Sequence, residues 1–185
     1  MHVSVVRKRM VLLCWNDELL ILLFLCFVAT ANNQITGTIP EKFGEDLNLR
    51  SISFRNNQIK GTLPASFLQD LPDLRELDLS NNLINGPIPS TITEMGKLEE
   101  LYLNGNDLEG DLPPDMASLN ALTILDISET KIAGSLDDAL CGRFDWDSLR
   151  VDCLSEEVTC SCATDCCNSD GYCCDMTGNT ACEVP

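Results

Sequence analysis

Acidic residues and cysteines are the residue types in this chain whose numbers and spacing suggest chemistry. The 185 residues include 29 Asp and Glu, 11 Cys and one histidine, His2. Paired carboxylates can carry out general acid–base catalysis or bind calcium, whereas clustered thiolates bind soft metals or form disulfides. Because the only histidine is His2, a histidine-based triad or a histidine-ligated zinc site is excluded from the folded part of the chain.

Nine of the cysteines cluster near the C-terminus, which is typical of a disulfide-stapled module in an oxidising compartment. A thiolate metal cluster is the alternative, since C-x-C and C-C spacings also suit soft metals. We expect disulfides, with no metal site and no cofactor, and an odd count leaves one cysteine unmatched. The disulfide candidates are Cys141, Cys153, Cys160, Cys162, Cys166, Cys167, Cys173, Cys174 and Cys182.

The N-terminal residues 1–31 predict a secretory signal peptide. Arg7, Lys8 and Arg9 precede an apolar run from Leu19 to Val28, and an A-x-A pattern ends at Ala31. A membrane anchor is the alternative. A membrane-spanning helix requires about 20 apolar residues, however, and this apolar run has roughly half that number. A mispredicted start is a further alternative. Any membrane contact would use this segment, and we expect a secreted or cell-surface protein.

The formal net charge of −17 opposes binding to other polyanions. Nucleic-acid phosphates and anionic membrane surfaces are both repelled by such a surface. DNA or RNA is therefore not expected as a partner.

Five stretches of the chain resemble one another: NNQITGTIP, NNQIKGTLP, NNLINGPIP, GNDLEGDLP and ETKIAGSLD. A fixed period of this size predicts a stacked repeat rather than a closed globule. The first aligned column advances in steps of 24, 25, 24 and 24 residues and contains Asn33, Asn57, Asn82, Asn106 and Thr130.

Apolar residues precede each column position with the spacing of a short strand, as Leu77 and Leu79 precede Asn82. Stacked strands predict a parallel sheet, and a buried asparagine column can satisfy backbone groups at its edge. Segments 64–68 and 114–119 suit single helical turns on the outer side. A glycine column, where a β-carbon would be hindered, contains Gly37, Gly61, Gly86, Gly110 and Gly134.

The same spacing extends the repeat in both directions. One step beyond Thr130, it predicts a sixth strand at Trp146, Leu149 and Val151. One step back from Asn33, it places a strand at Leu25, Val28 and Thr30, inside the predicted signal peptide.

The pattern L-x-x-L-x-L-x-x-N-x-L-x-G-x-I-P resembles the leucine-rich repeat of the plant-type extracellular class, over about residues 25–152. The resemblance implies an α/β solenoid, right-handed and curved, with a parallel sheet on its concave face, short helical turns outside and a ligand-binding role. We assign residues 32–152 to the repeats. The chain departs from the family at Thr130 and Asp137, and no cysteine-pair cap precedes the repeats.

We assign residues 153–185 to a small disulfide-rich tail. Residues 136–174 are similar to the tail of leucine-rich-repeat proteins predicted from diatom genomes, except that Ala163 replaces a cysteine of that pattern. This similarity implies no activity.

The strand register assigns a set of polar residues to the exposed concave face. Tyr102 lies among charges near its centre and is a hot-spot candidate. Glu76 and Glu100 could suggest acid–base chemistry or a calcium site, but we expect a flat surface without a cleft and hence no enzyme. The predicted partner-binding residues are Ser53, Arg55, Glu76, Asp78, Glu100, Tyr102, Asn104, Asp126 and Arg150.

The favoured function is a non-enzymatic extracellular module that binds a protein, peptide or glycan through the concave face. The alternatives are the ectodomain of a membrane-anchored receptor-like protein and a secreted enzyme inhibitor.

Overall fold

The structure is a computed structural model. It describes residues 11–13, 26–29, 33–42, 49–141, 146–152, 158–159, 163–167 and 173–175.

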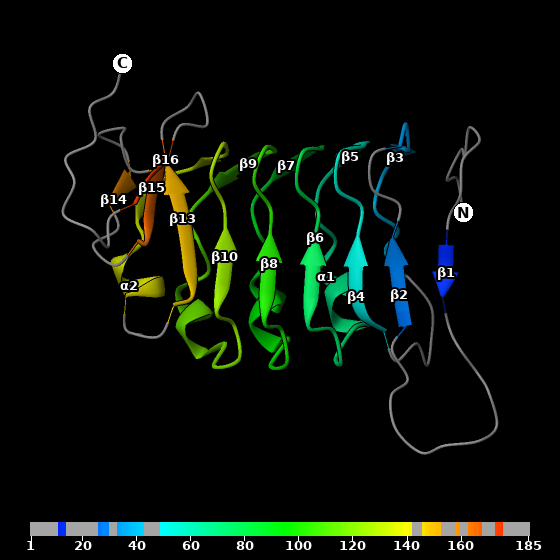
Figure 1. Cartoon of the computed structure of the whole chain (residues 1–185), viewed down its shortest axis with the longest axis horizontal. Helices are drawn as coiled ribbons and strands as arrows, with labels where there is room; N and C mark the ends of the chain where they lie inside the picture. The colour runs from blue at the N-terminus through cyan, green and yellow to red at the C-terminus, as the bar shows by residue number, and fades with distance from the viewer. Residues whose placement is uncertain are drawn as a thin grey trace.

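The main feature is a nine-stranded sheet in the order β1-β2-β4-β6-β8-β10-β13-β15-β16. Its strands from β2 to β15 run parallel, and antiparallel pairs close both edges (Figure 1). The parallel arrangement confirms the prediction from the repeat. The strands are β1 (Val11–Leu13), β2 (Cys26–Ala29), β4 (Leu49–Ser53), β6 (Glu76–Asp78), β8 (Glu100–Tyr102), β10 (Ile124–Asp126), β13 (Ser148–Asp152), β15 (Asp165–Cys167) and β16 (Cys173–Asp175).

The register of this sheet follows the repeat. Leu77 pairs with Leu101, which pairs with Leu125, which pairs with Leu149. The sixth strand is therefore confirmed as β13, which contains Leu149 and Val151 but begins after Trp146. At the other end, Val28 of β2 pairs with Ile52, so a strand does precede Asn33.

A second, smaller sheet was not expected from the sequence. It follows the asparagine column in each repeat and has the order β11-β9-β7-β5-β3. A two-stranded sheet joins β12 to β14. These strands are β3 (Thr36–Gly37), β5 (Gln58–Gly61), β7 (Leu83–Gly86), β9 (Asp107–Gly110), β11 (Lys131–Ile132), β12 (Gly134–Ser135) and β14 (Val158–Thr159).

Short helical turns return the chain from one strand to the next and lie behind the main sheet in Figure 1. Helix α1 begins directly after Pro64 and buries Phe67 and Leu68. Proline suits this position because it fixes the backbone and its missing N–H would have no helical partner. The expected turns at 64–68 and 114–119 are confirmed. The elements are α1 (Ala65–Gln69), the 3₁₀ turns η1 (Ser90–Glu94) and η2 (Pro114–Ser118), and α2 (Asp137–Leu140).

One continuous core runs between the sheet and the helical turns. Leu77, Leu101, Leu125 and Leu149 are fully buried at equivalent positions of successive repeats. Burying such a side chain stabilises the fold by about 1.5–3 kcal/mol. Each repeat therefore depends on its neighbours for its core.

The asparagine column forms a hydrogen-bond ladder between repeats, as predicted. The Asn82 side-chain amide donates to the carbonyl oxygens of Phe54, Leu79 and Ser80 at 3.0, 3.0 and 3.1 Å. Its Oδ1 accepts the N–H of Ile59 at 3.1 Å. Asn106 repeats this arrangement one turn further on.

The residue before the asparagine column adopts the left-handed backbone region, which the repeat pattern does not predict. Asn56, Asn81, Gly105 and Glu129 have φ of 56°, 53°, 66° and 54°. A β-carbon on Gly105 would lie 2.3 Å from Asn81 Oδ1, so a larger residue there would require the Asn81 side chain to move. The predicted glycine column also has positive φ throughout, at Gly37, Gly61, Gly86, Gly110 and Gly134.

The last repeat uses a different set of side chains. The Thr130 hydroxyl donates to the Ile127 carbonyl at 2.8 Å. The carboxylate of Asp152 accepts the N–H groups of Glu129 and Thr130 at 2.9 and 3.0 Å. Trp146 packs against the core and donates its Nε1–H to the Leu140 carbonyl at 3.3 Å.

Several predictions fall outside the described residues. Most of the predicted signal peptide does so, and so do Cys153, Cys160, Cys162 and Cys182. Cys141 is disulfide-bonded. No helix within the described residues is both long and apolar enough to cross a membrane.

Candidate binding face

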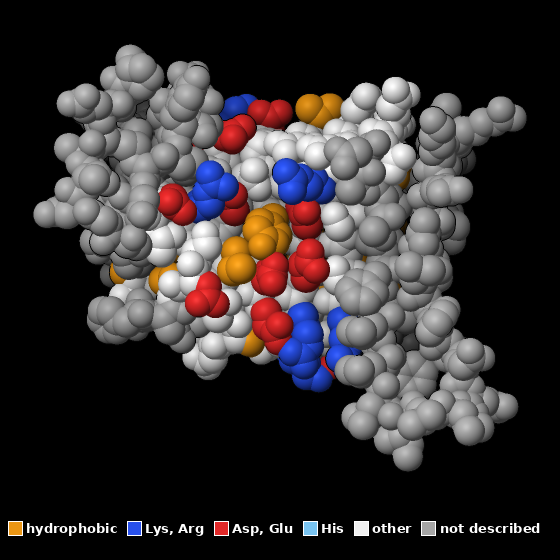
Figure 2. Space-filling model, viewed as in Figure 1, with side chains coloured by type: hydrophobic (Ala, Val, Ile, Leu, Met, Phe, Trp, Pro, Cys, Tyr) orange, Lys and Arg blue, Asp and Glu red, His pale blue; other side chains and the backbone are white. Residues whose placement is uncertain are grey.

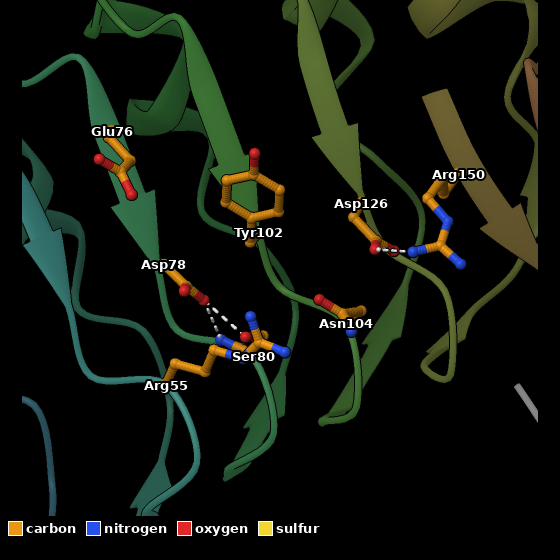
Figure 3. A pocket seen from close by; sticks show the side chains of 8 residues that line it. All are labelled: Arg55, Glu76, Asp78, Ser80, Tyr102, Asn104, Asp126 and Arg150. Atoms are coloured by element: carbon orange, nitrogen blue, oxygen red, sulfur yellow. Dashed lines mark hydrogen bonds and ion pairs between the residues drawn. The ribbon is translucent and has the colours of Figure 1, made fainter. Parts of the chain in front are cut away.

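The face of the main sheet opposite the helical turns contains a hollow of about 320 Å3, which we term the central hollow. The expectation of a flat surface is therefore wrong. Figure 3 shows its side chains rising from the strands and strand ends of five successive repeats. They are Arg55, Glu76, Asp78, Ser80, Tyr102, Asn104, Asp126 and Arg150.

The structure brings most of the predicted face residues together in the central hollow. Ser53 and Glu100 are the two that do not line it. Each nevertheless contacts a lining residue: the Ser53 hydroxyl donates to Asp78 Oδ2 at 3.4 Å, and the Tyr102 hydroxyl donates to Glu100 Oε2 at 2.8 Å. All nine predicted partner-binding residues therefore lie in the central hollow or contact a residue that lines it.

Asp78 and Asp126 are not the exposed strand residues that the sequence predicted. They are 9% and 4% exposed. Oδ1 of Asp78 accepts both the N–H and the hydroxyl of Ser80, at 3.0 and 2.6 Å, and Asp126 binds Ser128 in the same way. These contacts replace water at the buried carboxylates.

Ser80 lines the hollow but is not among the predicted partner-binding residues. A signal for it exists, because the triplets Asp78-Leu79-Ser80 and Asp126-Ile127-Ser128 recur at the ends of two strands. A short side chain two residues after an aspartate can bond to it locally.

Tyr102 stands near the middle of the central hollow in Figure 3. Burial is the main cause that raises the pKa of its phenol above the ordinary value of 10.0. The hydrogen bond to Glu100 and the negative charges of Glu100, Glu76 and Asp78 raise this pKa further. The phenol therefore stays neutral at physiological pH and serves as a hydrogen-bond donor, while its ring lines the central hollow.

Two acidic side chains face one another on neighbouring strands, since Glu76 pairs with Glu100 in the register. The hydroxyl of Ser51 donates to Glu76 Oε2 at 2.8 Å. Like charges placed directly opposite each other destabilise a sheet. In the described part of the chain, neither Glu76 nor Asp78 forms an ion pair.

The two arginines of the central hollow differ in their surroundings. Arg150 lies 3.2 Å from Asp126 Oδ2 and 3.9 Å from Asp165 Oδ2, so carboxylates already compensate its charge. Arg55 is exposed and lies beyond ion-pair distance of Asp78.

Viewed from outside, the same face has an apolar centre bordered by acidic and basic side chains (Figure 2). Its chemistry suits hydrogen bonding and charge recognition around an aromatic ring. Among the residues that the structure describes, no group of three His, Cys, Asp or Glu is placed to hold a metal ion.

Sequence comparison identifies the repeat over part of the chain. Residues 47–108 match the leucine-rich repeat family model. No curated protein sequence matches the chain significantly.

Solved structures resemble the chain over a larger part. The BIR2 ectodomain from Arabidopsis thaliana is 26% identical over 60% of this chain and 57% of its own, with a TM-score of 0.56. The BIR3–SERK2 complex from Arabidopsis thaliana is 28% identical over 73% and 71%, with a TM-score of 0.61. The plant peptide hormone receptor RGFR1 in complex with RGF2 is 30% identical over 68% and 20%, with a TM-score of 0.63.

The chain thus spans 57% of the BIR2 ectodomain and 20% of RGFR1. The matched repeat, the parallel register and these structures agree on one architecture. The chain has the leucine-rich-repeat fold, and the solved structures that it resembles include ectodomains and receptors of plants.

Proposed function

We propose that this chain is a non-enzymatic, extracellular binding module that recognises a protein or peptide through the central hollow. The observation that carries the proposal is the hollow itself, which five repeats line with polar groups around Tyr102. A concave site with a few converging polar groups is the usual form of a binding site. A glycan is the alternative partner of the same surface.

The similar structures support a peptide or protein in preference to a glycan. RGFR1 was solved in complex with RGF2, and BIR3 in complex with SERK2. These partners belong to those proteins, and they make a polypeptide the first class of ligand to test here.

The proposal includes a secreted or cell-surface location. Its basis is the basic and apolar N-terminal segment together with the cysteine-rich tail. Strands β1 and β2 both lie within residues 1–31, so cleavage after Ala31 would remove two strands from the main sheet. N-terminal sequencing of the mature protein separates a cleaved leader from the receptor-like alternative, in which this segment stays as a membrane anchor.

Tyr102→Ala tests the binding face. Peptides selected from a random display library against the wild-type protein should bind this variant about 30-fold more weakly, equivalent to about 2 kcal/mol for a hot-spot residue. Titration calorimetry measures the affinity. The melting temperature should change by only a few degrees, because Tyr102 is partly exposed.

Leu83→Ser is the matched control. Leu83 is 52% exposed on β7 of the second sheet and does not line the central hollow. Equal affinity of the wild type and Tyr102→Ala, or an equal loss in Leu83→Ser, would remove the central hollow as the binding site.

A further inference from the structure

We propose that the central hollow receives a lysine or arginine side chain from its polypeptide partner, held against the Tyr102 ring between the carboxylates of Glu76 and Asp78. This inference rests on the proposed function and adds the chemistry of the ligand. Four features of the described residues support a cation in this place.

The first feature is negative charge without a compensating cation. Glu76 and Asp78 line the hollow and form no ion pair among the described residues. Glu76 Oε2 accepts from Ser51, whereas no hydrogen bond to Oε1 is found within the described part of the chain. The buried Asp78 holds its Oδ2 at 3.4 Å from the Ser53 hydroxyl, which is a long contact. Both carboxylates therefore retain capacity to accept from an ammonium or guanidinium group.

The second feature is the pairing of Glu76 with Glu100 across β6 and β8. Two carboxylates opposite each other weaken a sheet, and a local rule is most often broken where function requires it. A cation bound beside Glu76 would relieve this repulsion. Repulsion between Glu76 and Glu100 then lowers the stability of the free protein, and binding of a cation restores that stability in the complex.

The third feature is the fixed ring of Tyr102. Its hydroxyl is tied to Glu100 Oε2 at 2.8 Å, which sets the orientation of the ring. No cation stacks on this ring within the described residues. An aromatic face beside carboxylates attracts a cation through both the ring quadrupole and the negative charges.

The fourth feature is the placement of positive charge. Arg150 is already compensated by Asp126 and Asp165, so it offers little to an acidic side chain. Arg55 is exposed and follows β4, and in Figure 3 its side chain extends across Ser80, below Tyr102 and on the side of the hollow away from Arg150. The net charge of −17 also steers cationic partners towards the protein and repels acidic ones.

A positional-scanning peptide array tests the inference on the full-length protein. Nonapeptides carry Arg, Lys, norleucine or Glu at the central position and random residues elsewhere. We expect the wild type to be retained about tenfold more on the Arg and Lys sets than on the norleucine set, and least on the Glu set. The preference should weaken as salt rises from about 0.05 to 0.5 M.

Glu76→Gln is the decisive variant. It should reduce retention on the Arg set about tenfold, because one charge-assisted contact is lost. Its melting temperature should not fall, since the repulsion with Glu100 disappears. Glu109→Gln is the matched control: it removes an exposed carboxylate from β9 of the second sheet and should leave the preference unchanged.

The outcomes separate this inference from the proposed function. Retention on norleucine or Glu sets equal to that on Arg, an unchanged preference in Glu76→Gln, or retention that requires added calcium would each overturn the cation site. If Tyr102→Ala still abolishes that retention, the central hollow remains a peptide site of another chemistry. If no peptide set retains the protein, both the inference and the proposed function fail.

Discussion

Internal repeats and the last repeat meet the same backbone requirement with different chemistry. In the repeat that contains Asn82, the N–H groups of Asn81 and Asn82 donate to the backbone carbonyls of Asn104 and Gly105, at 2.8 and 3.2 Å. At the equivalent positions of the last repeat, the N–H groups of Glu129 and Thr130 donate instead to the side chain of Asp152. One carboxylate therefore takes the place of two carbonyl groups.

The two regions also differ in the number of hydrogen bonds that the side chain in the asparagine column forms. The buried Asn82 makes three donor contacts and one acceptor contact, all with backbone groups. The partly buried Thr130 donates once to Ile127 and accepts the Ile132 N–H only at 3.4 Å. Internal repeats are thus joined by a neutral amide, whereas the last repeat depends on a charged group with a weaker column residue.

The largest expected effect is at the internal column. Asn82→Ala should lower the free energy of unfolding by about 3 kcal/mol, because the buried Ile59 N–H loses its acceptor and three further hydrogen bonds are lost. The three carbonyl groups involved each keep one other donor. Thr130→Ala should cost only about 1 kcal/mol, since it removes one hydroxyl hydrogen bond. Urea unfolding followed by circular dichroism measures both losses. Losses of equal size would refute the contrast between the two regions.

Much of this architecture follows from the sequence, because the spacing of Asn57, Asn82 and Asn106 fixes the strands on either side of each asparagine. The same count placed Asp78, Tyr102, Asp126 and Arg150 in one row, which the register confirms. The second sheet was missed because its strands β3, β5, β7 and β9 end at the glycine column, where the pattern indicates a bend rather than a strand.

The repeat pattern could not predict those features of the site that depend on contacts between side chains. Alternation places Asp78 and Asp126 on the outer face, yet their bonds to Ser80 and Ser128 draw them into buried positions. Asp152 occupies an ordinary outward position, and its contact with Glu129 spans 23 residues. Such contacts require the stacked geometry of two repeats, which no single repeat sequence contains.

The second expected effect concerns Asp152. Asp152→Ala should lower the free energy of unfolding at pH 7 by about 2 kcal/mol, because two N–H groups lose their acceptor. Asp152→Asn keeps one carbonyl oxygen as an acceptor and removes a charge that burial disfavours, so its loss should be clearly smaller than that of Asp152→Ala. Thermal and urea unfolding rank the two variants. A larger loss of unfolding free energy in Asp152→Asn than in Asp152→Ala would show that the Asp152 carboxylate does not replace the two backbone carbonyls of the internal repeats.

The pH dependence of stability sharpens this contrast. Burial raises the pKa of Asp152 above its ordinary value of 3.8, against the opposing effect of the two N–H donors, and Asp126 raises it further. The folded protein therefore holds this proton more tightly than the unfolded chain does. The stability that this tighter proton binding contributes is complete below about pH 4 and is lost as pH rises through the folded-state pKa of Asp152. Wild type should accordingly lose stability relative to Asp152→Asn as pH rises above 4, and urea unfolding at several pH values measures the difference.

The smallest expected effect is a gain at Glu129. This residue has φ of 54°, whereas the equivalent internal positions use Asn56, Asn81 and Gly105, which tolerate the left-handed region. Glu129→Asn should therefore raise the free energy of unfolding by about 0.5 kcal/mol while its N–H still donates to Asp152. Glu129→Gln is the control, since it removes the charge but keeps the unfavourable backbone. If Gln stabilises the protein as much as Asn does, relief of charge explains the gain, and the last repeat carries no backbone strain that the internal repeats avoid.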